Sequence, residues 1–142
     1  MNAVRHAEMP WEEWRPGVLT RVWMAAPFGA RQMHAIEQLV DPGLGAPRHW
    51  HYAEEHLTIL EGCAEVFVED EVAVFERGTT VLFPSRSWHG FRNVGDGRLH
   101  ALGVFSWPVH ETFFENAPPG VAIREYDAVD GGTRRRLIPE YL

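Results

Sequence analysis

The sequence of 142 residues predicts an all-β fold, either an antiparallel sandwich or a barrel. About eight or nine short apolar segments recur at intervals of roughly 8–12 residues, and Gly or Pro stands between them. No convincing helical period interrupts these segments, so a parallel sheet built from βαβ units is not expected.

The first two expected strands are separated by turn signals. Val18–Ala26 is apolar and rich in β-forming residues, and Pro27-Phe28-Gly29 ends it. Arg31–Val40 alternates loosely and stops at Asp41-Pro42-Gly43, where Pro presets φ and Gly supplies a positive φ.

The middle of the chain predicts a hairpin. Arg48–Glu61 is expected to run extended as far as Gly62. Cys63–Glu69 alternates apolar and polar residues, which is the pattern of a half-buried strand. The polar tip Glu69-Asp70-Glu71 then leads into Val72–Glu76.

Three further segments complete the predicted barrel. The apolar run Thr79–Phe83 is followed by a turn over Pro84–Ser87 and by the extended segment Trp88–Asn93. Gly95-Asp96-Gly97 predicts a hairpin turn before the last clear strand, Arg98–Trp107.

The length predicts a single domain covering residues 1–142. Its expected parts are a barrel core at about 18–107, an N-terminal arm at 1–17 and a C-terminal arm at 108–142. Within the second arm, Pro108–Asn116 is expected to form a short helix, because Phe113 and Phe114 give it an apolar side.

Composition excludes several classes of function. The net charge of −7 disfavours a nucleic-acid partner. All 13 basic residues are Arg, which excludes a Schiff-base lysine and a phosphate-loop lysine. Cys63 stands alone and is expected to be an inert buried thiol.

Because the chain shows neither a signal peptide nor an apolar stretch of membrane-spanning length, we expect a cytoplasmic protein with no membrane partner.

One segment carries the strongest chemical signal. His49 and His51 stand two residues apart, so in a strand both imidazoles point to one face. Glu55 has the same parity if the strand continues without a bulge, and His89 begins a later extended segment. Three neutral imidazoles and one carboxylate from neighbouring strands make a site for one divalent metal ion, Fe, Mn, Zn or Ni.

This spacing resembles that of the cupin superfamily. The first cupin motif is met by Gly43, His49, His51, Glu55 and Gly62, and the second by Gly78, Pro84, His89 and Asn93. The second motif departs at its middle glycine, where this chain has Arg86. The resemblance implies a small jelly-roll barrel, with the metal held by His49, His51, Glu55 and His89. It also implies a homodimer.

The other carboxylates near the motif are weaker candidates. Glu54 could replace Glu55 as the ligand, but its parity points outward, so Glu55 is preferred. No catalytic residue is assigned, although Glu37 on the strand before the motif is one candidate for a general base.

The remaining histidines are expected to be ordinary. His56 has the opposite parity to the ligands, and His6 and His110 are expected to be solvated in the arms. His34 and His100 lie in strands, where they are either core residues or partners that orient a ligand imidazole.

Three residues are candidates for contacts with a substrate: Arg86, Phe91 and Met33. Arg86 stands at a glycine position of the family, where φ is expected to be positive. It is either a cation at the mouth of the barrel that binds an anionic ligand or a solvated turn residue. Phe91 and Met33 belong to a set of large apolar side chains, some of which would line a pocket over the metal.

The expected function is therefore that of a mononuclear-metal enzyme acting on a small organic acid or an aromatic molecule. Four protein ligands on an ion that prefers six leave room for substrate and for O₂ or water. Fe(II) would suit a dioxygenase, and Zn²⁺, Mn²⁺ or Ni²⁺ a cyclase, isomerase or lyase. The alternative is a non-catalytic or sensory cupin that binds a small-molecule ligand. Metal-free epimerase chemistry would need an acid–base pair that the sequence does not show.

Overall fold

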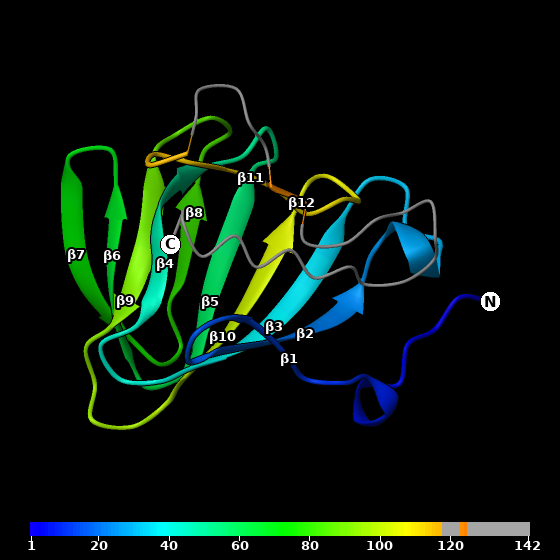
Figure 1. Cartoon of the computed structure of the whole chain (residues 1–142), viewed down its shortest axis with the longest axis horizontal. Helices are drawn as coiled ribbons and strands as arrows, with labels where there is room; N and C mark the ends of the chain where they lie inside the picture. The colour runs from blue at the N-terminus through cyan, green and yellow to red at the C-terminus, as the bar shows by residue number, and fades with distance from the viewer. Residues whose placement is uncertain (118–122, 125–142) are drawn as a thin grey trace.

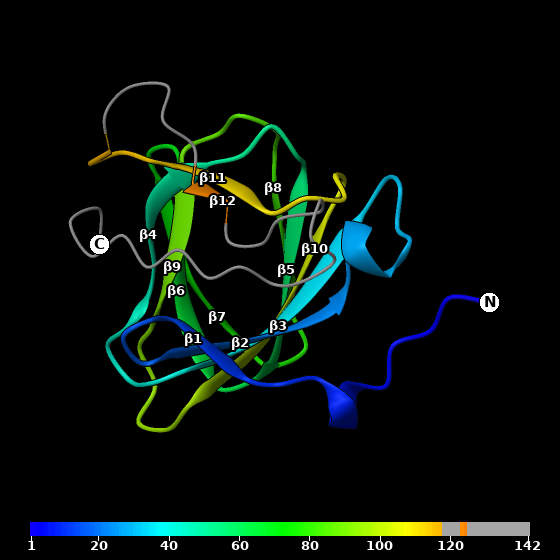
Figure 2. The same ribbon diagram turned by 45° about the vertical axis from the view of Figure 1, so that its right-hand side comes forward.

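Two six-stranded antiparallel sheets form the opposite walls of a barrel, which confirms the predicted all-β class (Figures 1 and 2). The computed structural model describes residues 1–117 and 123–124. The strands are β1 (Glu12–Arg15), β2 (Val18–Met24), β3 (His34–Val40), β4 (Gly45–Trp50), β5 (Glu55–Glu61), β6 (Cys63–Val68), β7 (Glu71–Glu76), β8 (Thr80–Phe83), β9 (His89–Asn93), β10 (Leu99–Phe105), β11 (Glu111–Phe114) and β12 (Ile123–Arg124). The 3₁₀ turns are η1 (His6–Glu8) and η2 (Ala26–Phe28).

The order of the strands is that of a jelly roll. One sheet has the order β1-β2-β3-β10-β5-β8 and the other β12-β11-β4-β9-β6-β7. The chain changes sheet at every connection from β3 to β6 and again from β7 to β11. Because β4 and β5 are consecutive in the chain but lie on opposite walls (Figure 2), the segment that joins them crosses the barrel.

The inner faces of the two sheets meet in an apolar core. Leu57 and Ile59 of β5 face Val66 of β6 and Phe91 of β9, and each of these side chains is at most 4% exposed. Burial of one such side chain stabilises the fold by roughly 1.5–3 kcal/mol. The core therefore provides a rigid base for the polar residues that lie nearby.

The expected helix over Pro108–Asn116 is wrong, because this segment contains strand β11. Phe113 and Phe114 pair with Trp50 and His49 of β4, and the rings of Phe113 and Trp50 stack at 4.0 Å. The free hydrogen-bonding edge of β4 accepts a strand here, and this tertiary pairing outweighs the helical spacing of the apolar residues.

Both expected arms contribute strands to the sheets. Within the arm at 1–17, β1 pairs with β2, and Trp14 of β1 is 2% exposed. Residues 118–122 and 125–142 of the C-terminal arm lie outside the described residues. In the part of the chain that is described, no helix is long and apolar enough to span a bilayer.

Candidate metal centre

The four predicted ligands come from three strand ends. His49 lies near the end of β4, His51 follows that strand directly, Glu55 begins β5 and His89 begins β9. His49 and His89 are cross-strand partners, and the bulge that precedes His49 in β4 contains Pro47, which has no N–H to contribute to the ladder.

The expectation of one extended strand over Arg48–Glu61 is wrong. The chain leaves β4 at Trp50 and crosses to the other sheet before β5 starts. The backbone N–H and C=O of Glu54 are both bonded to Ser106, at 2.8 and 2.9 Å, and these bonds hold the crossing in place. Glu55 therefore reaches the histidines across the barrel and not along a common strand face.

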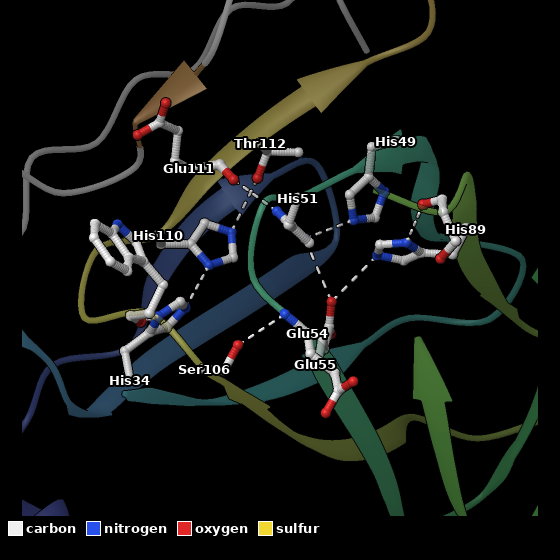
Figure 3. Close-up of polar contacts among 12 residues, drawn as sticks. His34, His49, His51, Glu54, Glu55, His89, Ser106, His110, Glu111 and Thr112 are labelled. Atoms are coloured by element: carbon white, nitrogen blue, oxygen red, sulfur yellow. Dashed lines mark hydrogen bonds and ion pairs between the residues drawn. The ribbon is translucent and has the colours of Figure 1, made fainter. Parts of the chain in front are cut away.

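The ligand atoms of these four residues converge on one point (Figure 3). They all lie within 4.8 Å of one another. The Nε2 atoms of His49 and His51 are 3.1 Å apart, and Oε2 of Glu55 lies 3.3 Å from Nε2 of both His51 and His89. All four residues are buried. Glu54, in contrast, is exposed and its side chain points away from this cluster (Figure 3).

Backbone carbonyls decide which nitrogen of each ring faces the cluster. The Nδ1 atoms of His49, His51 and His89 lie 2.6, 2.6 and 2.8 Å from the carbonyl oxygens of Pro47, Glu111 and Ser87. A carbonyl oxygen can only accept, so each Nδ1 carries the proton and donates it. In a neutral ring this leaves the Nε2 lone pair directed at the cluster.

The electrostatics of the cluster suit a cation. Burial, together with the neighbouring His89 and His51, holds the pKa of His49 well below its ordinary value, so that ring is neutral at pH 7. Burial alone would raise the pKa of Glu55, but the contacts with His51 and His89 outweigh it and hold that pKa well below its usual range.

Two buried atoms of the cluster fit a metal ion as their partner. Oε2 of Glu55 and Nε2 of His89 are buried and have no hydrogen-bond partner among the described residues. Such atoms are costly to bury unless they bind something. Three imidazole nitrogens and one carboxylate oxygen are a donor set for a divalent transition metal, so His49, His51, Glu55 and His89 could hold one.

A chain of hydrogen bonds runs beside the ligands, and the expectation that His110 is solvated is wrong. His110 is 6% exposed, because β11 lies in the sheet and turns this ring inward. Its Nδ1 donates to Nε2 of His34 at 2.9 Å, and its Nε2 lies 3.2 Å from the hydroxyl of Thr112. Nδ1 of His34 donates to the carbonyl of Trp107, and the ring stacks on Phe105. His34 is thus a core residue, one of its two expected roles.

Of the expected substrate contacts, the structure brings Phe91 to the ligands. Phe91 is 4% exposed and lines the cavity beside them. Met33 is 48% exposed and precedes β3, outside the residues that line this cavity. Arg86 has the positive φ that its glycine-like position predicts, 63°, and its exposed side chain lies over the ring of Tyr52.

The structure does not bring Glu37 to the site. Its carboxylate accepts hydrogen bonds from Arg21 and Trp23 and pairs with His100 at 2.6 Å, so it is engaged elsewhere. Burial would raise the pKa of Glu37, but these three partners together hold it below its usual range. His100 is therefore bonded to Glu37 and not to a ligand imidazole.

Two cavities lie beside Arg15, the last residue of β1. A small one of about 20 Å³ borders His49, His51 and Glu55, with room for about one water molecule. A larger and mostly apolar one of about 550 Å³ lies beside it. Arg15, Ala46 and Phe91 line both cavities. The position of Arg15 could not be predicted from an alternation pattern, because Arg15 and its neighbour Trp14 are both buried.

Comparisons with known proteins agree with this geometry. A family model described as a cupin domain matches residues 36–105. This chain belongs to the cupin superfamily. Among curated proteins, none matches the sequence.

Solved structures show the same cupin fold. An RmlC-like cupin from Shewanella frigidimarina is 18% identical, with a TM-score of 0.66 and coverage of 76% of this chain and 91% of that one. The polyketide cyclase RemF from Streptomyces resistomycificus is 23% identical, with a TM-score of 0.65 and coverage of 74% and 78%. Oxalate decarboxylase from Lactobacillus farciminis is 24% identical, with a TM-score of 0.70 and coverage of 78% of this cupin but 34% of the decarboxylase. This cupin thus spans about a third of that enzyme.

The choice between the two neighbouring glutamates gives a direct prediction. Glu55→Gln should lower the bound metal at least tenfold, because an amide oxygen carries no charge to bind a cation. Glu54→Gln should leave the metal content unchanged, since that side chain is exposed and points away. Elemental analysis of both variants measures this, and loss of metal in Glu54→Gln alone would transfer the ligand role to Glu54.

The buried neutral histidines predict how stability depends on pH. The pKa of His34 lies well below 6.5, because of burial and then the neighbouring His110, and that of His49 is lowered in the same direction. The unfolded chain therefore binds more protons below about pH 6.5, and stability is lost as the pH falls through that value. Urea unfolding of the metal-free protein should show a slope of up to about 1.4 kcal/mol per pH unit for each such group. The slope should be shallower in His34→Gln; an equal slope would contradict this account.

Proposed function

We propose that this cupin is a mononuclear-metal enzyme that acts on a small organic acid. The observation that carries the proposal is the convergence of three Nε2 lone pairs and one carboxylate, with backbone carbonyls holding each ring in the required tautomer. The small cavity that borders the ligands shares Arg15, Ala46 and Phe91 with a mostly apolar cavity of about 550 Å³, a volume that suits a small-molecule ligand.

The structural relatives support this class of function. One is named as an oxalate decarboxylase and another as a polyketide cyclase. The first name denotes an enzyme that acts on a small organic acid, and the second an enzyme that cyclises a polyketide. Their likeness in fold makes chemistry on an organic acid a reasonable proposal for this chain.

The residues of the chain have distinct roles in the proposed enzyme. The carbonyls of Pro47, Glu111 and Ser87 orient the three imidazoles, and Glu55 supplies the negative charge. Phe83 and Phe91 keep bulk water from the small cavity. A divalent ion bound there would polarise an oxygen of the substrate as a Lewis acid or, as Fe(II), support oxygenase chemistry. We place a dioxygenase first and a cyclase, isomerase or lyase second.

A second candidate function is binding without catalysis. The cavity that directly borders the ligands is only about 20 Å³, which would suit a metal with a closed set of ligands. A sensory or structural cupin would have such a site. The adjoining volume of about 550 Å³ is what favours the enzyme.

Metal identification with a substrate screen tests the proposal. Protein purified without a His tag is analysed for metals, then loaded separately with Fe(II), Mn²⁺, Zn²⁺ or Ni²⁺ and incubated with a panel of small carboxylic acids. Oxygen uptake with Fe(II) would support the dioxygenase, and conversion without oxygen would support the lyase, isomerase or cyclase. Tight metal binding with no conversion of any acid would favour the second candidate. Absence of bound metal after every loading would overturn both.

Two further expectations stay predictions. A homodimer predicts about twice the chain mass in sedimentation equilibrium. A cytoplasmic location predicts recovery of the protein in the cytoplasmic fraction of its source cells.

A further inference from the structure

A third cavity borders His51, one of the four candidate ligands. We call it the aromatic cavity, because the residues on its wall include Tyr52, Phe105 and Trp107. Its volume is about 250 Å³ and its wall is mostly apolar. His51 and Phe105 also line the small cavity beside the candidate ligands. The aromatic cavity therefore adjoins the candidate metal centre through a side chain that belongs to that centre.

Two exposed aromatic rings lie at this cavity. Tyr52 is 56% exposed and Trp107 is 54% exposed. Among the described residues, these are the Phe, Trp and Tyr side chains that are exposed rather than partly or fully buried. Exposed apolar side chains that are scattered singly are ordinary, but a group of them at one site marks a place where another molecule binds. The position of both rings at one cavity therefore points to a ligand.

The loops that form the cavity are held in place by backbone hydrogen bonds. The N–H of Ser106 donates to the carbonyl of Glu54 at 2.9 Å, which ties the loop after β10 to the loop after β4. The carbonyl of Trp107 accepts a hydrogen bond from His34, and the carbonyl of Pro108 accepts one from the N–H of Ala26 at 3.0 Å. A preformed cavity spares its ligand the cost of ordering these loops.

Size and charge define the class of ligand. An apolar cavity of about 150 Å³ is large enough for benzene, whereas drug-sized molecules occupy about 300–1,000 Å³. The volume of about 250 Å³ thus suits one aromatic ring with a small substituent. Such a ring would pack edge-to-face or offset against the rings on the wall. No Arg is among the described residues that line the cavity and the chain contains no Lys, so no guanidinium or ammonium would hold an anionic group there.

We propose that the aromatic cavity binds an uncharged molecule with a single aromatic ring, such as a phenol, which packs against Tyr52 and Trp107 and contacts His51. The inference goes beyond the proposed function, because this molecule is a second ligand beside the metal and not the acid that the enzyme converts. A metal held by Nε2 of His51 and a ring in contact with the same imidazole share one side chain. Binding of one ligand should therefore change the surroundings of the other.

The test is a titration of the ¹⁵N-labelled, metal-free protein with phenol, followed by NMR through the indole N–H signals of its six tryptophans. The signal of Trp107 should shift most, and that of Trp88, which is not among the residues lining the cavity, should hardly shift. Trp107→Phe identifies the signal by its absence and should bind phenol within about threefold of the unchanged protein, because a ring remains. Cyclohexanol, which is similar in size but has no aromatic ring, should bind more weakly than phenol.

Two variants remove a ring from the wall. Trp107→Ala and Tyr52→Ala should each weaken phenol binding at least about fivefold. Both side chains are more than half exposed, so both variants are expected to fold. Val74→Ala is the matched control, because Val74 of β7 is 57% exposed and is not among the residues lining the cavity, and it should bind phenol as the unchanged protein does. Normal phenol binding in either ring variant would overturn the proposal. So would the largest shift at another tryptophan, or binding of cyclohexanol or benzoate as tight as that of phenol.

The Co²⁺-loaded protein tests the contact with His51 and separates this inference from the proposed function. Saturating phenol should shift the visible absorption of the bound Co²⁺, and an unchanged spectrum would reject the contact with His51. If no metal binds, phenol binding that depends on Trp107 and Tyr52 would keep the aromatic cavity and reject the metal enzyme. Metal uptake with turnover of an acid, but without phenol binding, would keep the enzyme and reject the aromatic cavity.

Discussion

Replacing His51 by alanine should lower the affinity for the metal by well over tenfold. His51 offers a buried Nε2 atom that lies 3.1 Å from Nε2 of His49 and 3.3 Å from Oε2 of Glu55. Alanine has no such nitrogen, and no neighbouring side chain takes its place among the four candidate ligands. Loss of a residue that merely supports a ligand already costs about 10–100-fold in metal affinity, and loss of a ligand itself should cost more.

His56→Ala is the matched control for this prediction. His56 is the first residue after Glu55 in β5, so its side chain points to the opposite face of that strand. It should retain the metal at the level of the unchanged protein. The measurement is competition with a chelator followed by elemental analysis, and full metal retention in His51→Ala would reject the ligand assignment.

Replacing Gly45 by alanine should destabilise the protein by about 3 kcal/mol, the upper part of the range for overpacking. A Cβ at this position would lie 1.9 Å from the carbonyl oxygen of Phe91 and 2.8 Å from Cα of Arg92. Both are backbone atoms of β9, so β4 and β9 would have to separate. Because His49 and His89 pair across these same strands, the substitution should also weaken metal binding.

Gly97→Ala provides the control for a general effect of alanine. Among the described residues other than its two chain neighbours, none has an atom within 4 Å of a Cβ built at Gly97, so the substitution should change stability by less than about 0.5 kcal/mol. Urea unfolding of the two metal-free variants gives the difference. Equal stability of Gly45→Ala and the unchanged protein would show that β4 and β9 tolerate the extra methyl group.

The sequence predicts that the four candidate ligands gather, but it does not predict how Glu55 reaches the other three. His49 and His51 do lie together, as their spacing predicts. Glu55 joins them although β4 ends at Trp50, so Glu55 and the two histidines do not share one strand face. The crossing to the opposite sheet brings Glu55 back to the same point, so Glu55 joins the candidate ligands by a path that strand parity does not describe.

The residues that were missed depend on pairing between distant segments. Arg15 is buried because β1 bulges against β2, and His110 is buried because β11 pairs with β4. Neither pairing produces a periodic pattern of apolar residues that could be recognised in the sequence. The opposite case is Arg86, whose positive φ was expected from the glycine that the cupin motif has at this position, and the conformation of such a short turn is decided locally.

The sequence by itself determined the β class, most of the turns and the identities of the candidate ligands, because alternation, Gly and Pro act over a few residues. The tertiary structure alone decided that Pro108–Asn116 contains a strand, that Glu37 is engaged by Arg21 and His100, and that Arg15 borders the cavity. These outcomes depend on which strand edges and faces meet when the two sheets close. Contacts between segments far apart in the chain set that closure, and no local pattern encodes it.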